Sequence, residues 1–115
     1  MLDPETQQCL DLMDAVIYRE LRARIDVGDD PSNDDGCTML SSFLAKMVLN
    51  SFTLQPVLEI EEECADYLTE VIYSEMRARV AFGDDPATHE GCETLSSMVI
   101  DMIFECFTVR LKIAK

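Results

Sequence analysis

Apolar residues recur at spacings of three and four along two stretches of the chain, which is the period of a helix that buries one face. The first stretch lies between residues 10 and 25, and the second lies between residues 64 and 80. The stripes are Leu10, Met13, Ile17, Leu21 and Ile25 in the first stretch, and Cys64, Leu68, Ile72, Met76 and Val80 in the second. Each stripe predicts an amphipathic helix with a polar outer face.

A second apolar stretch follows each of these helices. Its stripe is Cys37, Leu40, Leu44, Met47 and Val48 in the first half of the chain, and Cys92, Leu95, Val99, Met102, Ile103 and Cys106 in the second. We expect a short helical turn at Asp30–Pro31 and at Asp85–Pro86, with aspartate as the N-cap and proline as the first helical residue. The main helix then begins at about Cys37 or Cys92. A helix that begins directly at the Asp-Pro pair is the alternative.

Glycine and arginine mark the place where the first helix of each half ends. Gly28 and Gly83 follow the last apolar positions and predict helix stops, because glycine readily adopts the left-handed conformation of a helix C-cap. The arginines just before them, at positions 22, 24, 77 and 79, lie near the negative ends of the helix dipoles. We expect them to complement these dipoles and to pair with the acidic loops that follow.

The two halves repeat one unit without gaps. Residues 16–25 read VIYRELRARI and residues 71–80 read VIYSEMRARV, at a constant offset of 55 residues. The GDDP motif at residues 28–31 returns at residues 83–86 with the same offset. So long a match predicts a duplicated helix–acidic loop–helix unit rather than chance similarity.

Four helices with short connections predict an all-α fold, in which the two tandem repeats form a pseudo-two-fold four-helix bundle. We expect a single domain over residues 1–115, with unit one at about 1–54 and unit two at about 58–115. Residues 55–57 form a hinge between the units, because Pro56 does not fit inside a helix.

Several large apolar side chains lie off the stripes of the second helices and predict a contact surface. Burying such a side chain is worth roughly 1.5–3 kcal/mol, and a bundle of this size has little further interior to hold them. The residues are Phe43, Phe52, Ile100 and Phe104. We expect a homodimer or a partner protein to cover them, which leaves a structural or assembly module as one reading of the chain.

The charge balance points to a basic partner. The formal net charge is −14, while 48% of the residues are hydrophobic, so the chain has a core and carries its acid in loops and helix ends. Such a charge repels nucleic acid and anionic membranes and attracts basic proteins. The predicted contact residues are the carboxylates of the two loops beyond those needed for capping: Asp29, Asp34, Asp35, Asp84 and Glu90.

The sequence offers little for catalysis or metal binding, and it predicts a binding protein rather than an enzyme, without a cofactor. The chain has one histidine, His89, and five cysteines without a C-x₂-C pair, which disfavours a zinc site. Neither acidic loop has the spacing of an EF-hand, so a cation-binding protein is a weaker reading. Absence of a leader or a spanning segment, together with the odd number of helical cysteines, predicts a cytoplasmic protein with reduced thiols.

These observations favour a small acidic helical module that occupies a basic surface of another protein. In its most concrete form it is an inhibitor that presents carboxylates in place of phosphates to a nucleic-acid-binding protein, as viral or mobile-element antagonists do. That step is an analogy from charge and size.

Overall fold

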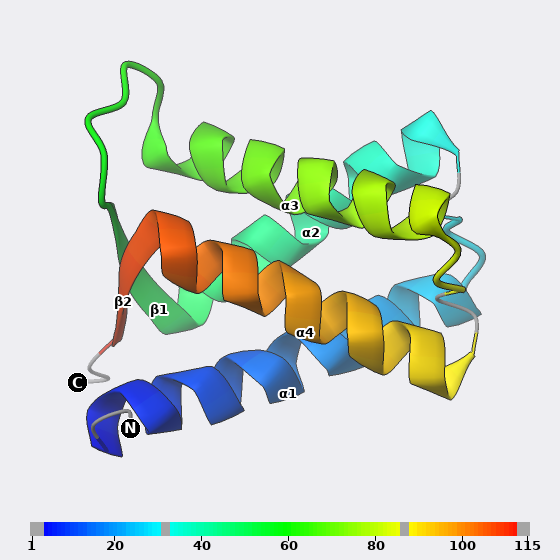
Figure 1. The fold of residues 1–115 in the computed structure, drawn as a ribbon, viewed down its shortest axis with the longest axis horizontal. Helices are drawn as coiled ribbons and strands as arrows, with labels where there is room; N and C mark the ends of the chain where they lie inside the picture. Colours follow the sequence, from blue (N-terminus) through cyan, green and yellow to red (C-terminus); the bar gives the residue numbers. More distant parts are fainter. Residues whose placement is uncertain (1–3, 31–32, 86–87, 113–115) are drawn as a thin grey trace.

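The computed structural model describes residues 4–30, 33–85 and 88–112, which form four helices and a two-stranded sheet (Figure 1). In chain order the elements are α1 Pro4–Asp26, α2 Asp34–Ser51, β1 Phe52–Pro56, α3 Cys64–Phe82, α4 His89–Cys106 and β2 Phe107–Leu111. The predicted helical class therefore holds for most of the described chain, with the sheet as an addition.

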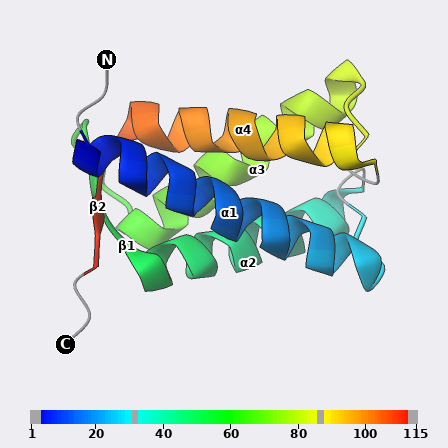
Figure 2. The ribbon, with the colours of Figure 1, turned by 90° about the horizontal axis from the view of Figure 1, so that it is seen from below.

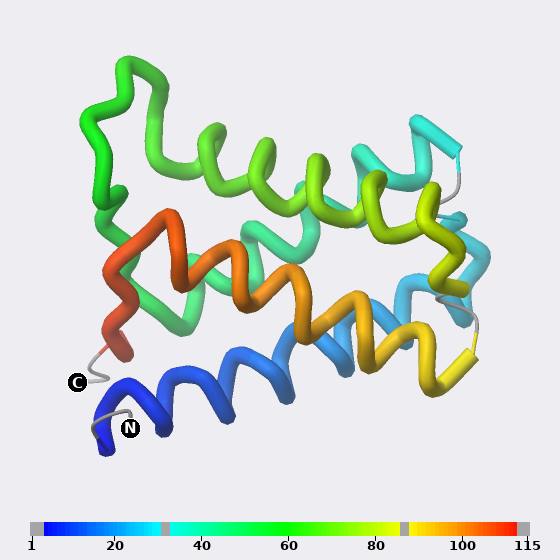
Figure 3. Tube along the Cα trace, viewed as in Figure 1, coloured from blue at the N-terminus to red at the C-terminus, as the bar shows by residue number. Residues whose placement is uncertain are grey.

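The four helices form a bundle in which successive helices run in opposite directions (Figures 1 and 2). Helices α1 and α3 each pack against both α2 and α4, so α1 and α3 lie diagonally across the bundle. The connections from α1 to α2 and from α3 to α4 lie at one end, and the strands lie at the other (Figure 3). The acidic segments after α1 and α3 therefore share one end of the molecule.

The interior is built from the stripes that the sequence predicts. Met13 and Ile17 of α1, Leu44 of α2 and Ile72 of α3 are completely buried, as is Leu95 of α4. Cys9, Cys37 and Cys92 are buried with them, and all five cysteines are free thiols. Burial raises the pKa of the Cys37 and Cys92 thiols, which favours the neutral form of each.

The expectation of helices alone is wrong at two places, residues 52–56 and 107–111. These segments pair as antiparallel strands in a register that places Leu54 opposite Val109 and Phe52 opposite Leu111. Phe52 and Thr53 begin β1, and Phe107, Thr108 and Val109 begin β2. Aromatic and β-branched residues fit a pleated surface better than a helix interior. Gln55 and Pro56, predicted as part of a hinge, lie inside β1.

The second helix of each half begins three residues earlier than predicted, and its N-cap is a different residue. Asn33 caps α2 by accepting from the N–H of Gly36 at 2.7 Å, and Thr88 caps α4 by accepting from the N–H of Gly91 at 2.9 Å. The carbonyls of Asp30 and Asp85 accept instead from the N–H groups of the two caps, so each aspartate begins a turn before the helix. Pro31 and Pro86 lie outside the described residues.

The glycines near the loops meet two different requirements. Gly28 and Gly83 have φ of 111° and 121°, so both use the conformational freedom that the sequence assigns to helix stops. At Gly36 and Gly91 a Cβ would lie only 2.0 and 1.9 Å from the carbonyl oxygens of Asp30 and Asp85. Glycine therefore lets the preceding turn pass directly over the first turn of the helix.

Candidate functional site

The acidic loops were the predicted contact surface, but part of their charge is already neutralised within the chain. The Nε of Arg24 lies 2.8 Å from a carboxylate oxygen of Asp29, and Arg79 and Asp84 form the same ion pair at the same distance. The Asp29 and Asp84 side chains are only 17% and 19% exposed. Each pair ties a loop back to the helix before it, as the sequence predicts for these arginines.

The remaining loop carboxylates are exposed and lie in the first turn of a helix. Asp34 and Asp35 begin α2, and Glu90 lies in the first turn of α4, where the positive end of the helix dipole favours negative charge. Asp34 also accepts a hydrogen bond from the Tyr73 hydroxyl of α3. That bond to the carboxylate is the main cause that raises the pKa of Tyr73.

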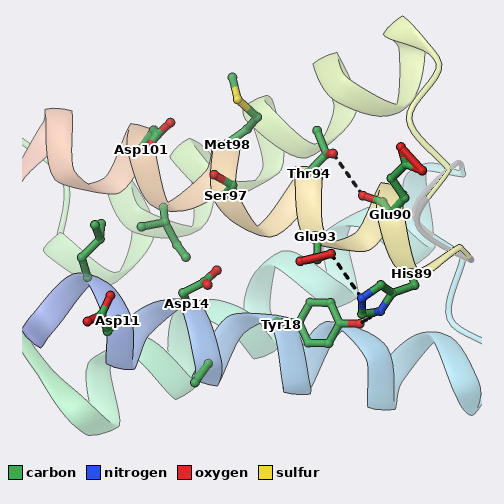
Figure 4. A pocket seen from close by; sticks show the side chains of 13 residues that line it. Asp11, Asp14, Tyr18, His89, Glu90, Glu93, Thr94, Ser97, Met98 and Asp101 are labelled. Atoms are coloured by element: carbon green, nitrogen blue, oxygen red, sulfur yellow. Dashed lines mark hydrogen bonds and ion pairs between the residues drawn. The ribbon is translucent and has the colours of Figure 1, made fainter. Parts of the chain in front are cut away.

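A matching contact joins α1 to α4. The Tyr18 hydroxyl of α1 is hydrogen-bonded to Nδ1 of His89, and Nε2 of His89 lies 3.2 Å from a carboxylate oxygen of Glu93 (Figure 4). With the proton on Nε2, Tyr18 donates to the ring and the ring donates to Glu93. The His89 side chain is 73% exposed but links two helices.

An open groove of about 710 Å³ lies between α1 and α4 and contains this contact at one end (Figure 4). We call it the α1–α4 groove. The residues that line it are Leu10, Asp11, Asp14, Ala15 and Tyr18 of α1 and His89, Glu90, Glu93, Thr94, Ser97, Met98, Ile100 and Asp101 of α4. Five of these side chains are carboxylates, and the lining has no lysine or arginine among the described residues.

The groove brings negative charges close together, which disfavours the ionised form of its carboxylates. Partial burial is the main cause that raises the pKa of Asp14, and the negative charges of Glu93 and Asp11 raise it further. Asp14 and Glu93 come from different helices, so helix packing brings their like charges together. A positive group in the groove counteracts both the effect of burial and the repulsion between carboxylates, because it favours their ionised form.

The opposite face of the bundle has a smaller and less acidic counterpart. A hollow of about 260 Å³ between α2 and α3 is lined by Thr38, Thr69, Glu70, Tyr73 and Ser74. At the constant offset, Asp14 corresponds to Thr69, Glu93 to Thr38, and Asp101 to Lys46. Across all thirteen matched positions the α1–α4 groove has five carboxylates, whereas the other face has four carboxylates and a lysine.

The predicted apolar contact surface is mostly absent from the exterior. Phe52 and Ile100 are 1% and 2% exposed, because Phe52 turns inward at the start of β1 and Ile100 faces the bundle interior. Phe43 and Phe104 are half-buried, and the Arg24 guanidinium lies 4.1 Å from the centroid of the Phe43 ring. Among the described residues, the large apolar side chains that are exposed lie elsewhere: Leu12, Val27, Met39, Val57, Leu58 and Phe82.

Of the groove carboxylates, only Glu90 is among the contact residues predicted from the sequence, and four are not: Asp11, Asp14, Glu93 and Asp101. A local signal exists, since Asp11 and Asp14 lie three residues apart on one helix face and Glu90 and Glu93 do the same. The sequence does not show that these two faces meet, because that depends on the packing of α1 against α4.

Within the described residues, no cluster of three or more histidine, cysteine, aspartate or glutamate side chains is placed to hold a metal ion. None of the helices over these same residues is both long and apolar enough to cross a membrane.

Comparisons with protein-family models, with curated proteins and with solved structures give no match.

Proposed function

We propose that this chain is a binding protein, not an enzyme, and that it occupies a basic surface of a partner protein through the α1–α4 groove. The observation that carries the proposal is the groove itself, where five carboxylates line a hollow without a lysine or arginine among the described residues. Opposite charge across such an interface speeds association and selects the partner.

In this proposal the partner-binding surface is the α1–α4 groove and not the two acidic loops. Asp29 and Asp84 are held by arginines of their own chain, and Asp34 accepts from Tyr73, so these carboxylates have structural partners. Glu90 belongs to both surfaces, because it is one of the loop carboxylates predicted as contact residues and it also lines the groove. As in the sequence-based hypothesis, the most concrete form is a cytoplasmic inhibitor, of the viral antagonist type, that masks a nucleic-acid-binding surface.

Two variants with equal charge changes test the proposal. Asp14→Thr/Glu93→Thr/Asp101→Lys gives the groove the residues of the opposite face and changes the net charge by about +4 at neutral pH. Glu59→Lys/Glu61→Lys makes the same change in the exposed segment before α3. Proteins captured from a cell extract are compared by mass spectrometry at low and high salt. We expect basic proteins to be lost with the groove variant and at high salt, and retained with the control.

Equal capture by both variants contradicts the groove as the binding surface. Partners that persist at high salt with both variants favour the alternative, an assembly module that acts through exposed apolar residues. Phe82, at 78% exposure, and Leu58, at 69%, are then the first residues to mutate.

We also propose that the two halves are structural repeats related by a pseudo-two-fold axis. The strand register supports this, because Leu54 pairs with Val109, its own equivalent at the 55-residue offset. Helices α2 and α4 begin and end at equivalent positions as well. Superposition of the two halves in an experimental structure tests the relation, and halves with unrelated helix directions contradict it.

The homodimer stays a proposal with a separate test. Phe43 and Phe104 are half-buried and retain some apolar surface, although Phe52 and Ile100 do not. Sedimentation at micromolar concentration should give a mass near twice 13.0 kDa. A mass of 13.0 kDa contradicts the dimer and leaves the groove proposal intact.

A further inference from the structure

We propose that the α1–α4 groove receives a basic amphipathic helix of the partner protein. This inference rests on the proposed function and specifies its ligand. It follows from the length of the groove, from the mixture of apolar and acidic side chains in its lining, and from the difference between the two faces of the bundle.

The groove has the length of a short helix. Its lining on α4 extends from His89 to Asp101, and on α1 it extends from Leu10 to Tyr18. At 1.5 Å per residue the α4 side is about 18 Å long, which a helix of about twelve residues matches. Helices α1 and α4 run in opposite directions side by side, so a third helix can lie along both.

The lining contains the two kinds of side chain that an amphipathic helix requires. Leu10, Ala15 and Met98 supply apolar surface, and Asp14 and Glu93 supply negative charge beside it. A helix presents apolar residues at spacings of three, four and seven on one face and places lysine or arginine at the borders of that face. A small polycation, such as a polyamine, matches the charge but leaves the apolar side chains uncovered.

The charge of the groove excludes the other large ligands. Nucleic acids and anionic membranes carry the same sign and are repelled. A neutral apolar helix is disfavoured too, because it covers carboxylates without giving them a partner. Basic groups avoid this cost, and they also relieve the repulsion between Asp14, Glu93 and Asp11.

The opposite face does not offer a second equivalent site. Its hollow has about 260 Å³, and Glu70 is the one carboxylate among the described residues that line it. Lys46 occupies the position that corresponds to Asp101 in the α1–α4 groove. We therefore expect one helix per chain.

Titration calorimetry on the full chain tests the inference with three probes. The first is a fourteen-residue peptide of leucine and lysine with leucines at helical spacing, the second has the same composition in strict alternation, and the third is spermidine. We expect the helical peptide to bind at one per chain, about tenfold more tightly than the alternating peptide, and to gain helicity in circular dichroism. Spermidine should bind at least about tenfold more weakly than the helical peptide.

The same variants locate the site. Asp14→Thr/Glu93→Thr/Asp101→Lys should weaken binding of the helical peptide at least about tenfold, and Glu59→Lys/Glu61→Lys should change it less than about threefold. Amide NMR shifts of the wild-type chain provide a readout that does not depend on folding of a variant. Shifts should concentrate at Asp14, Glu93 and Ser97, and shifts centred on Thr38 and Thr69 overturn the site.

The outcomes separate this inference from the proposed function. Equal affinity for the two peptides, or spermidine binding as tight as that of the helical peptide, overturns the helical ligand but keeps the acidic groove as a cation-binding surface. Unchanged peptide binding by the folded groove variant overturns both the helical ligand and the groove function.

Discussion

At the scale of single residues, glycine and aspartate each have more than one role in this chain. Gly28 stops a helix through its positive φ, whereas Gly36 makes room for a carbonyl oxygen. Asp29 is fixed by an arginine, whereas Asp14 faces other carboxylates. Residue type and spacing predict the helix stop at Gly28 and the ion pair of Asp29, because both roles are local. They do not predict the roles of Gly36 and Asp14, because each of these depends on a partner that folding brings near.

Alanine at Gly36 or Gly91 distinguishes the steric role of glycine from helix propensity. Propensity alone predicts that Gly→Ala inside a helix stabilises the protein by about 1 kcal/mol. The Cβ would lie about 2 Å from a backbone oxygen, so we expect a loss of about 1–3 kcal/mol in the free energy of unfolding instead. Urea denaturation measures the difference. A stabilised Gly36→Ala variant contradicts the close approach of the Asp30 carbonyl.

The repulsion in the groove should be visible in the pH dependence of stability. The folded chain raises the pKa of Asp14, so ionised Asp14 costs stability above both its folded and unfolded pKa values, and the cost disappears below them. Asp14→Asn should therefore raise the free energy of unfolding at pH 7 by up to about 0.5 kcal/mol, a value limited by solvent screening.

This gain should narrow as the pH falls toward 3.8, the ordinary pKa of an aspartate. Glu105→Gln on α4, outside the groove lining, is the control. Denaturation of wild type and both variants at several pH values provides the comparison. A gain for Asp14→Asn that does not change with pH shows that charge is not its cause.

At the scale of elements, the helices were predictable and the strands were not. A stripe of five apolar positions identifies α1 and α3, because the helical period repeats often enough to be distinct. The strands have five residues each, and the inward Phe52 and Leu54 also fit the end of an apolar helix pattern. Pairing of β1 with β2 is the contact between distant segments that makes them strands, and single-segment patterns do not encode it.

The caps of α2 and α4 give a prediction at this scale. Asn33→Ala and Thr88→Ala each remove the side-chain acceptor of a helix N–H, so each should lower the free energy of unfolding by about 1 kcal/mol. Gln8→Ala, at an exposed position of α1, should change it by less than about 0.5 kcal/mol. Chemical denaturation is sufficient to resolve these values. If neither cap variant differs from Gln8→Ala, another group satisfies these N–H donors.

At the scale of the whole molecule, the net charge and the local arrangement of charges affect partner binding in different ways. The net charge of −14 is evident from composition, and the prediction of a basic partner follows from it. The α1–α4 groove is not evident from composition, because its carboxylates come from helices whose contact is set by the bundle. The sequence similarity of the two halves provides an internal comparison, since three carboxylates of the α1–α4 groove correspond, at the 55-residue offset, to two threonines and a lysine.

Exchanging residues between the two faces separates the effect of net charge from the effect of charge position. A six-fold variant combines Asp14→Thr, Glu93→Thr and Asp101→Lys with the reverse changes Thr69→Asp, Thr38→Glu and Lys46→Asp. Its composition is identical to that of the wild type, and its net charge stays at −14, so long-range attraction of a basic partner is preserved. The acid moves from a groove of about 710 Å³ to a hollow of about 260 Å³.

If shape and charge must coincide, the six-fold variant should bind the helical leucine–lysine peptide at least about tenfold more weakly than wild type, at low and at physiological salt. The three reverse changes alone make the chain more acidic by about four charges and should not create a second tight site, because the hollow is too small to hold a helix. Calorimetry gives affinity and stoichiometry for both variants, and circular dichroism verifies their helicity. Wild-type affinity in the six-fold variant would show that total charge alone attracts the ligand and that the groove has no special role.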